Sequence, residues 1–502
     1  MSITLTDLTD RLRWPSSART LLYAVLLGLL SAQAQASEAP QGLKDAMVKI
    51  FTVSSEYDYF RPWTKSSPQQ SNGSGCVIAG NRILTNAHVV SNATYVQVRR
   101  NGDGKRYEAR VEHVIHDADL ALLTVDDPAF FENIQPIELG DLPAAQSDVT
   151  VYGFPRGGDA LSITKGVVSR IENQVYSHSG LYLLAGQIDA AVNPGNSGGP
   201  VIQDRRLVGV VMQTLAAGEN QGYMVPVDLV KRVLTDLEDG RYDGFPALGV
   251  RVQNLENPAA NAHYHLPVGS TGALVVQVQA NSTSAGVLRP DDVILEVEGN
   301  EIGDDGKFVF RGDERNSWQM LMQQHQIGEP FALTIWREGQ RMQIDVPLRL
   351  SVHDNQRIPD LRHDASPRYF IYGGLVFAPV TENLLRRFGK QWRDNAPTKL
   401  IYLMDYDNVP DEAVREWVVL QNVLPADANK GYHSATFLII ERFNGEPIRD
   451  LDHLVELVEA NADERAIFTT DLGFQIILNS AQAQAEQPHI LERYGISQDR
   501  AL

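Results

Sequence analysis

Ser197 lies in a loop of small and turn-forming residues, Asp189-Ala-Ala-Val-Asn-Pro-Gly-Asn-Ser-Gly-Gly-Pro200. Gly195, Gly198 and Gly199 allow backbone conformations that a Cβ would forbid, so two N–H groups can point to one spot. A serine on such a turn can act as a nucleophile, with the N–H groups of Gly195 and Ser197 as an oxyanion hole. On this segment alone, the alternative is an incidental serine in a loop rich in Gly, Pro and Asn.

Two upstream segments supply the other parts of a catalytic triad. His88 ends the apolar run that starts at Ile83, and Asp119 directly precedes the apolar strand 120–123. A serine nucleophile needs a general base, and the base needs a carboxylate that orients it. The order His, Asp, Ser is that of the chymotrypsin-like double barrel. The G-x-S-x-G match at 195–199 would favour an α/β-hydrolase esterase, but in that fold the histidine follows the serine.

Asp119 competes with other acids for the role of orienting carboxylate. We prefer Asp119 because the buried strand that follows would hold its carboxylate rigidly, whereas Asp117 is expected to be a solvated turn residue. Asp189 is assigned to the strand before the serine loop. The competing acids are Asp103, Asp117 and Asp189.

Further segments resemble landmarks of one protease family, in that family's order. The chain resembles an HtrA/DegP-type (Deg) serine protease from about residue 45 to its C-terminus, and within that family the two-PDZ branch best known from plant organelles. The resemblance implies a mainly β protein: a chymotrypsin-like double β-barrel protease domain followed by two PDZ-like α+β domains. The segments are 71–75, 162–169, 187–191, 222–226, 311–315, 367–377 and 429–432.

Pattern changes divide the chain into four parts. Short alternating strands up to about Leu237 indicate a β-barrel pair, and the helical spacing of 227–237 closes it. A polar linker starts at Glu238, and two weakly similar units follow, with helices expected at 317–324 and 452–459. The predicted parts are a signal peptide (1–36), the protease domain (37–240), PDZ domain 1 (245–350) and PDZ-like domain 2 (360–502).

The PDZ-like units predict peptide binding. A PDZ domain adds an extended C-terminus as a strand and holds its carboxylate with backbone N–H groups. The matching loops lie at 247–250 and 373–377, and the alternative is a buried strand start with an ordinary glycine turn. Relatives also use such domains for assembly. The expected carboxylate-binding residues are Leu248, Gly249, Val250, Gly374 and Leu375.

The first residues are typical of an export signal. Three arginines precede the apolar core 21–30, and small-x-small cleavage sites follow at Ala34 and Ala36. The core is about half as long as the roughly 20 residues that a membrane-spanning helix needs. Asp7 and Asp10 argue against an organelle transit peptide. We therefore expect the periplasm, with an uncleaved anchor or a lipid tether as the alternative.

Composition excludes several function classes. The net charge of −19 over 502 residues disfavours nucleic acid and anionic lipid as partners. A single cysteine, Cys76, excludes an intramolecular disulfide and is expected to be a small buried apolar residue. The His113–His116 pair lacks a cysteine or carboxylate cluster at ligand spacing, so we expect no metal site. Without a P-loop motif, nothing indicates ATP-driven unfolding, and we expect no cofactor.

The resemblance also implies how activity is controlled. Asn196 stands where digestive relatives carry an acid that a freed N-terminus captures, so activation by propeptide removal is not expected. The family's sensor loop corresponds to segment 172–184. The activating arginine of some relatives falls on Asn173 here, and Arg170 is the candidate substitute.

The sequence supports two functions. The first is an ATP-independent endopeptidase that degrades unfolded or damaged envelope proteins, as a homo-oligomer built from trimers. The second is a chaperone or scaffold that binds unfolded chains while its triad is mostly latent.

The predicted substrate pocket indicates cleavage after small or medium aliphatic residues. Basic-specific chymotrypsin-like proteases carry an acid six residues before the nucleophile, and Ala191 and Val192 occupy this region here. Tyr223 and Met224 are expected in the opposite wall. A buried Lys or Arg would be left unpaired, at a cost of several kcal/mol, whereas an aliphatic side chain gains about 1–3 kcal/mol. Mass spectrometry of casein fragments should show cuts after Val, Ala, Ile or Leu, and a majority after Lys or Arg would contradict the assignment.

Overall fold

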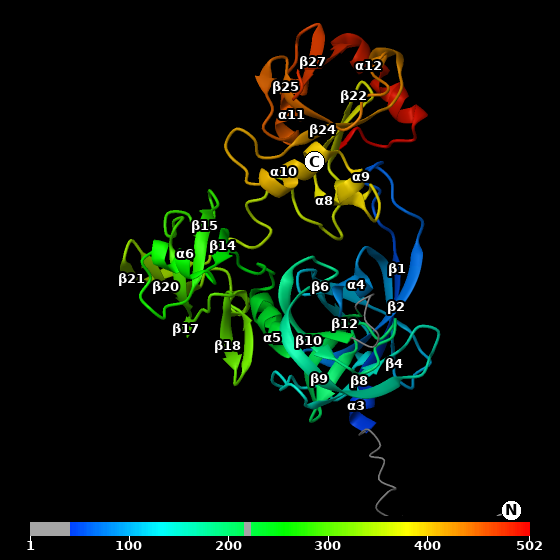
Figure 1. The fold of residues 1–502 in the computed structure, drawn as a ribbon. Helices are drawn as coiled ribbons and strands as arrows, with labels where there is room; N and C mark the ends of the chain where they lie inside the picture. The colour runs from blue at the N-terminus through cyan, green and yellow to red at the C-terminus, as the bar shows by residue number, and fades with distance from the viewer. Residues whose placement is uncertain (1–40, 215–221) are drawn as a thin grey trace, which may run out of the picture.

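Strands dominate the computed structural model, which describes residues 41–214 and 222–502 (Figure 1). Four sheet units follow one another along the chain. The predicted leader, residues 1–36, lies outside the described residues. Within the described ranges, no helix has the length and hydropathy needed to cross a lipid bilayer.

The first unit is a seven-stranded antiparallel sheet in the order β5-β4-β1-β2-β3-β7-β6. Four of the five residues of β7 are buried, which anchors the turn that precedes it. Cys76 on β2 is fully buried, and burial raises the pKa of its thiol to about 12, so it is a packing residue as predicted. The elements are α3 (Gln41–Asp45), β1 (Met47–Ser54), β2 (Gln69–Ile78), β3 (Arg82–Thr85), α4 (Ala87–Val90), β4 (Ala93–Arg100), β5 (Tyr107–Glu108), β6 (Arg110–Ile115) and β7 (Leu120–Thr124).

The second unit is a closed six-stranded barrel in the order β10-β13-β12-β11-β8-β9. All five residues of β13 are buried, as expected for an apolar strand paired on both edges. The apolar face of helix α5 packs against the barrel. This helix confirms the prediction of a helix at 227–237. The elements are β8 (Asp148–Gly153), β9 (Ser162–Val175), β10 (Tyr182–Ile188), β11 (Pro200–Gln203), β12 (Arg206–Thr214), β13 (Gly222–Pro226) and α5 (Val227–Asp236).

The third unit is a sheet in the order β14-β15-β16-β20-β21, with a separate hairpin, β18–β19. Strand β14 is an edge strand of this sheet. Helix α7 is shorter than the predicted 317–324 helix. The elements are β14 (Val250–Asn254), α6 (Pro258–His263), β15 (Ala273–Val278), β16 (Val293–Val297), β17 (Asn300–Glu301), β18 (Lys307–Arg311), β19 (Glu314–Ser317), α7 (Gln319–Met322), β20 (Pro330–Arg337) and β21 (Gln340–Pro347).

The fourth unit is a sheet in the order β28-β27-β25-β24-β23-β22-β29, whose last strand is the C-terminal end of the chain. Helix α11 confirms the predicted helix at 452–459. The elements are β22 (Tyr369–Tyr372), β23 (Leu375–Pro379), α8 (Glu382–Arg386), α9 (Trp392–Asn395), α10 (Thr398–Tyr406), β24 (Val418–Val423), β25 (Leu438–Phe443), β26 (Glu446–Pro447), α11 (Leu451–Glu459), β27 (Arg465–Thr470), β28 (Gln475–Asn479), α12 (Ser480–Arg493) and β29 (Arg500–Ala501).

The hydrophobic cores do not correspond one to one with the four sheet units. One continuous cluster of buried apolar residues runs from Leu43 to Leu348 and joins the first three units, whereas the fourth unit has clusters of its own. The arm between β1 and β2 reaches this fourth unit (Figure 1). There the ring of Phe60 packs edge-on against Phe388 at 5.3 Å, and Gln421 donates a 2.7 Å hydrogen bond to the carbonyl of Tyr59.

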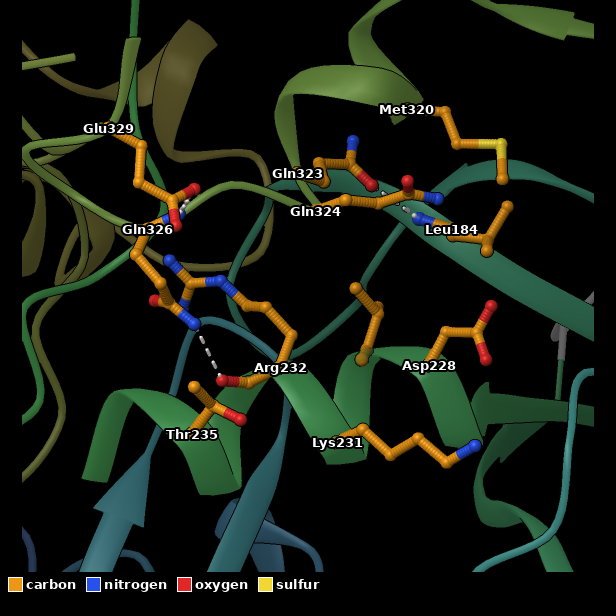
Figure 2. A pocket seen from close by; sticks show the side chains of 11 residues that line it. Leu184, Asp228, Lys231, Arg232, Thr235, Met320, Gln323, Gln324, Gln326 and Glu329 are labelled. Atoms are coloured by element: carbon orange, nitrogen blue, oxygen red, sulfur yellow. Dashed lines mark hydrogen bonds between the residues drawn. The ribbon is translucent and has the colours of Figure 1, made fainter. Parts of the chain in front are cut away.

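Arg232 of α5 joins the barrel to the third unit. Its guanidinium donates to the carbonyls of Gly244 at 2.5 Å and His325 at 3.2 Å, and it pairs with Asp236 at 2.9 Å. The side chain of Gln326 donates in return to the Arg232 carbonyl at 3.0 Å (Figure 2). Arg232 and Gln326 line a cavity of about 380 Å³ between α5 and the segment that follows α7.

Replacing Arg232 with Ala should destabilise this interface. The side chains of Arg232 and Asp236 are both almost fully buried, and removing one partner of a buried pair leaves the other charge uncompensated, at a cost of about 3–5 kcal/mol. Thermal melting should therefore shift down by several degrees. The matched control is Lys231→Ala, because the neighbouring Lys231 makes only an exposed pair with Asp141. Equal melting temperatures for the two variants would contradict this role.

Candidate active site

The structure brings His88 and Asp119 together. His88 lies on the short helix α4, and its Nδ1 lies 2.8 Å and 3.0 Å from the two carboxylate oxygens of Asp119. The backbone N–H of His88 donates to the same carboxylate at 2.9 Å. Burial alone would lower the pKa of His88, but the charge and the hydrogen bond of Asp119 raise it above its usual value. The carboxylate thus fixes the ring and favours a proton on Nδ1, which leaves Nε2 free to act as a base.

Asp119 adopts a left-handed backbone conformation, with φ of +52°. This conformation is uncommon for a residue with a side chain and persists where the surroundings hold it. Its N–H donates to the carbonyl of His116 at 3.1 Å, and its carbonyl accepts from the side chain of Asn86 at 2.7 Å. The turn between β6 and β7 therefore aims the carboxylate at His88.

The serine loop has the backbone that its glycines predict. Gly195 and Gly198 have φ of +101° and +81°, and a Cβ on Gly198 would lie 2.2 Å from the carbonyl oxygen of Ser74. Among the described residues, the N–H groups of Gly195 and Ser197 have no hydrogen-bond acceptor in the protein. Both predicted oxyanion-hole donors are therefore free to bind a ligand.

Ser197, the proposed nucleophile, makes no hydrogen-bond contact with His88, the proposed base, in the described part of the structure. The Oγ of Ser197 donates a long, 3.5 Å hydrogen bond to the carbonyl of Met212. No hydrogen bond joins Ser197 to His88 within the described part of the chain. Catalytic hydrogen bonds are often long or misaligned before substrate binds, so the arrangement is that of a site that still has to close.

Ser74 on β2 holds the serine loop, a role that sequence reasoning missed. Its hydroxyl donates to the carbonyl of Gly195 at 2.7 Å and accepts from the N–H of Phe154 at 2.8 Å. Its backbone N–H donates to the carbonyl of Ser197 at 2.8 Å. The only sequence signal was its place in the landmark 71–75.

The four predicted pocket residues differ in their exposure to solvent, two being accessible and two buried. Ala191 is exposed and Val192 is half-buried, so both can meet a substrate. Tyr223 and Met224 are 1% and 0% exposed, because β13 lies between two other strands of the closed barrel. They therefore present no surface to a substrate in this structure. The carboxylate of Asp189 accepts the N–H of Val167 at 2.5 Å, so it is already engaged at the end of β10.

Asp117 is not the solvated turn residue that the sequence predicted. It is buried, and its carboxylate binds the Nε2 of His353 at 2.6 Å and the hydroxyl of Tyr242 at 2.9 Å. Its hydrogen bond raises the pKa of His353. Both partners, His353 and Tyr242, lie on segments that connect domains. The sequence around Asp117 alone could not predict these contacts.

The two predicted carboxylate loops differ. In the first, the N–H groups of Leu248 and Gly249 have no acceptor among residues 41–214 and 222–502, and Val250 starts the edge strand β14. An extended peptide can add to such an edge. The binding of a carboxylate by this loop stays a prediction.

The second loop is closed by the chain itself, contrary to the prediction for Gly374 and Leu375. Strand β23, which starts at Leu375, is paired with β22 and β24, so no free edge follows the loop. The N–H of Gly373 already donates to the side chain of Gln487 at 2.8 Å, and the carbonyl of Gly374 accepts from Leu424 at 2.7 Å. Strand β29 then covers the other edge of β22.

The predicted control segment 172–184 is the β9–β10 hairpin, and the third unit holds it. Asn316 accepts the N–H of Asn173 at 3.3 Å. Gln323 accepts the N–H of Leu184 at 3.0 Å and donates to the carbonyl of Tyr182 at 2.8 Å (Figure 2 draws the first of these). Arg170 pairs with Glu172 at 2.6 Å and donates a long, 3.5 Å hydrogen bond to the hydroxyl of Tyr223 on β13.

Comparisons with known proteins agree with this architecture. Residues 73–210 match the trypsin-like peptidase domain, and residues 246–348 and 358–502 each match a PDZ domain. The chain is 37% identical to "Protease Do-like 2, chloroplastic" of Arabidopsis thaliana, over 91% of this chain and 75% of that protein. It is 36% identical to "Protease Do-like 4, mitochondrial" of the same plant, over 90% and 84%. A solved structure of the HtrA-type protease AlgW with a decapeptide covers 61% of this chain at 22% identity and a TM-score of 0.47.

Replacing Ser74 with Ala should impair catalysis more than substrate binding. The change leaves the carbonyl of Gly195 and the N–H of Phe154 buried without a partner, at about 1–3 kcal/mol each. A loop displaced by about 1 Å can lose about 100-fold in rate. We expect kcat for a short peptide to fall by about 10–100-fold, with KM nearly unchanged. Ser71→Ala is the matched control, since Ser71 is exposed on the same strand; a variant of Ser74 as active as this control would contradict the role.

Proposed function

The chain belongs to the Do-like (HtrA/Deg) family of serine endopeptidases, and we propose that it cleaves unfolded polypeptides with His88, Asp119 and Ser197. The observation that carries this assignment is the His88–Asp119 pair, which lies beside a serine loop with two unengaged N–H groups. The confirmed family resemblance supports the same roles.

The proposed mechanism follows from these positions. The Nε2 of His88 removes the proton of the Ser197 hydroxyl as its oxygen attacks the scissile carbonyl. Asp119 holds the imidazole tautomer and stabilises the imidazolium. The N–H groups of Gly195 and Ser197 bind the oxyanion. His88 then protonates the leaving amine, and water hydrolyses the acyl-enzyme.

Substrate capture falls to the first PDZ domain in this proposal. The free edge of β14 and the unengaged N–H groups of Leu248 and Gly249 support the binding of an extended C-terminus there. The second PDZ domain, whose loop is closed, would instead position the other domains or mediate assembly. Its contacts with the arm between β1 and β2 support that role.

Control of activity is proposed to run through the β9–β10 hairpin. Gln323 and Asn316 of the first PDZ domain hydrogen-bond to its backbone. A peptide that moves this domain would therefore move the hairpin, with neither Asn173 nor Arg170 supplying the arginine relay of some relatives.

The remaining parts of the proposal rest on the sequence. We propose that the protein acts in the periplasm on envelope proteins, that it needs no ATP, and that it forms a homo-oligomer built from trimers. The two relatives from Arabidopsis thaliana are described as a chloroplastic and a mitochondrial protease.

One observation favours the second candidate, a mostly latent protease that acts as a chaperone. Ser197 bonds to the carbonyl of Met212 rather than to His88. In this reading, unfolded chains bind while the site remains open.

Replacing Ser197 with Ala decides between these functions. Loss of the nucleophile should remove several orders of magnitude from casein turnover and leave binding of unfolded casein intact. Casein degradation is measured for the wild type, Ser197→Ala and the exposed control Ser71→Ala. Turnover by Ser197→Ala within about tenfold of the wild type would exclude the triad, and negligible turnover by the wild type with tight binding would favour the chaperone.

A further inference from the structure

Three histidines from distant parts of the chain meet beside the catalytic pair. His116 lies on the β6–β7 turn, His178 on the β9–β10 turn, and His363 on the segment that leads into β22. The rings of His178 and His363 stack at 3.9 Å with an angle of 13°, and the ring of His116 lies 5.2 Å and 4.8 Å from them. The sequence suggests His113 as the partner of His116 and predicts no metal site. In the structure, His113 lies outside this cluster.

The ring nitrogens of these residues are close enough to share an ion. One nitrogen from each histidine lies within 4.8 Å of the other two, and Nδ1 of His116 lies 2.9 Å from Nε2 of His178. In a tetrahedral zinc site with Zn–N bonds of about 2.0–2.1 Å, ligand nitrogens are about 3.3 Å apart. The cluster therefore reaches this geometry by changes of about 1.5 Å or less at its widest pair. We propose that His116, His178 and His363 bind one divalent transition-metal ion, with zinc as the best match.

The surroundings suit three imidazole ligands. The carboxylate of Asp364 lies 2.9 Å from Nε2 of His116, which places the proton on Nε2 and turns the lone pair of Nδ1 toward the cluster. A carboxylate behind a ligating histidine is the usual support of such a ligand.

All three ligands are only partly buried, so an ion can enter from solvent. Three histidines fill three of the four positions of a tetrahedral zinc ion and leave one for water. Imidazole suits zinc, copper, iron and nickel rather than magnesium or calcium, which prefer oxygen ligands. This chemistry makes a late first-row metal the expected occupant.

The ion would connect three segments that are distant in the sequence. His116 lies three residues before Asp119, and the ring of His178 lies 6.1 Å from that of His88. His363 lies in the segment before β22, at the start of the range 358–502 that matches a PDZ domain, and its ring donates to the carbonyl of His178 at 3.0 Å. The bound metal thus ties the start of the second PDZ domain to the β9–β10 hairpin beside His88.

Metal titration of the full-length Ser197→Ala protein tests the site without any need for proteolysis, so its outcome is independent of the proposed function. After treatment with a chelator, the protein is titrated with CoCl₂, and the visible absorption bands of tetrahedral cobalt are recorded; ZnCl₂ should then displace the cobalt. We expect one equivalent to bind. His178→Ala and His363→Gln should each weaken binding by at least about tenfold, and Asp364→Asn by about 10–100-fold.

The matched control is His113→Ala, which removes a histidine from the neighbouring strand and should bind cobalt as the parent protein does. Hydrogen exchange at 176–181 and 360–366 should slow when zinc is added to the parent protein, and remain unchanged in His363→Gln. Absence of tetrahedral bands in the parent protein, or equal affinity in the His178 and His113 variants, would overturn the proposal.

Discussion

The proposed nucleophile and its proposed base are carried by different β units, so the proposed catalysis depends on the seam between them. Ser74 lies at this seam: it belongs to the sheet of His88 and Asp119, yet it binds the carbonyls of both Gly195 and Ser197. Its own carbonyl accepts the hydroxyl of Thr85 at 2.7 Å. A single buried residue, through its hydroxyl and its backbone, therefore connects the strand that leads to His88 with the loop that carries Ser197.

The same seam explains why small residues are required around the serine. A Cβ on Gly199 would lie 2.1 Å from the carbonyl oxygen of Tyr152, and one on Gly198 would meet the backbone of Ser74. Gly198 thus serves two purposes, since it allows the left-handed turn and lets the two units approach, whereas Gly199 lets the serine loop pack against β8 within the barrel.

Much of the fold and the contact between His88 and Asp119 could be predicted from sequence because the signals are local. The glycine-rich loop, the order of the three catalytic residues and the apolar strand after Asp119 are all short patterns. The residues that escaped prediction act over long sequence separations. Ser74 bonds to a loop 121 residues away, and Asp117 to a histidine 236 residues away. The closure of the second PDZ loop likewise depends on Gln487, which no pattern near Gly374 could reveal.

The β6–β7 turn gathers the longest of these connections. Within four residues, His116 contacts the start of the second PDZ domain through Asp364, Asp117 binds His353 and Tyr242, and the carboxylate of Asp119 contacts His88. Because Asp119 is held in a left-handed conformation, a small change in the turn alters the direction of its carboxylate. A shift of the connecting segments would therefore act on the β6–β7 turn, whose Asp119 orients the proposed base, His88. Domain position can therefore act on the proposed triad through one short stretch of backbone.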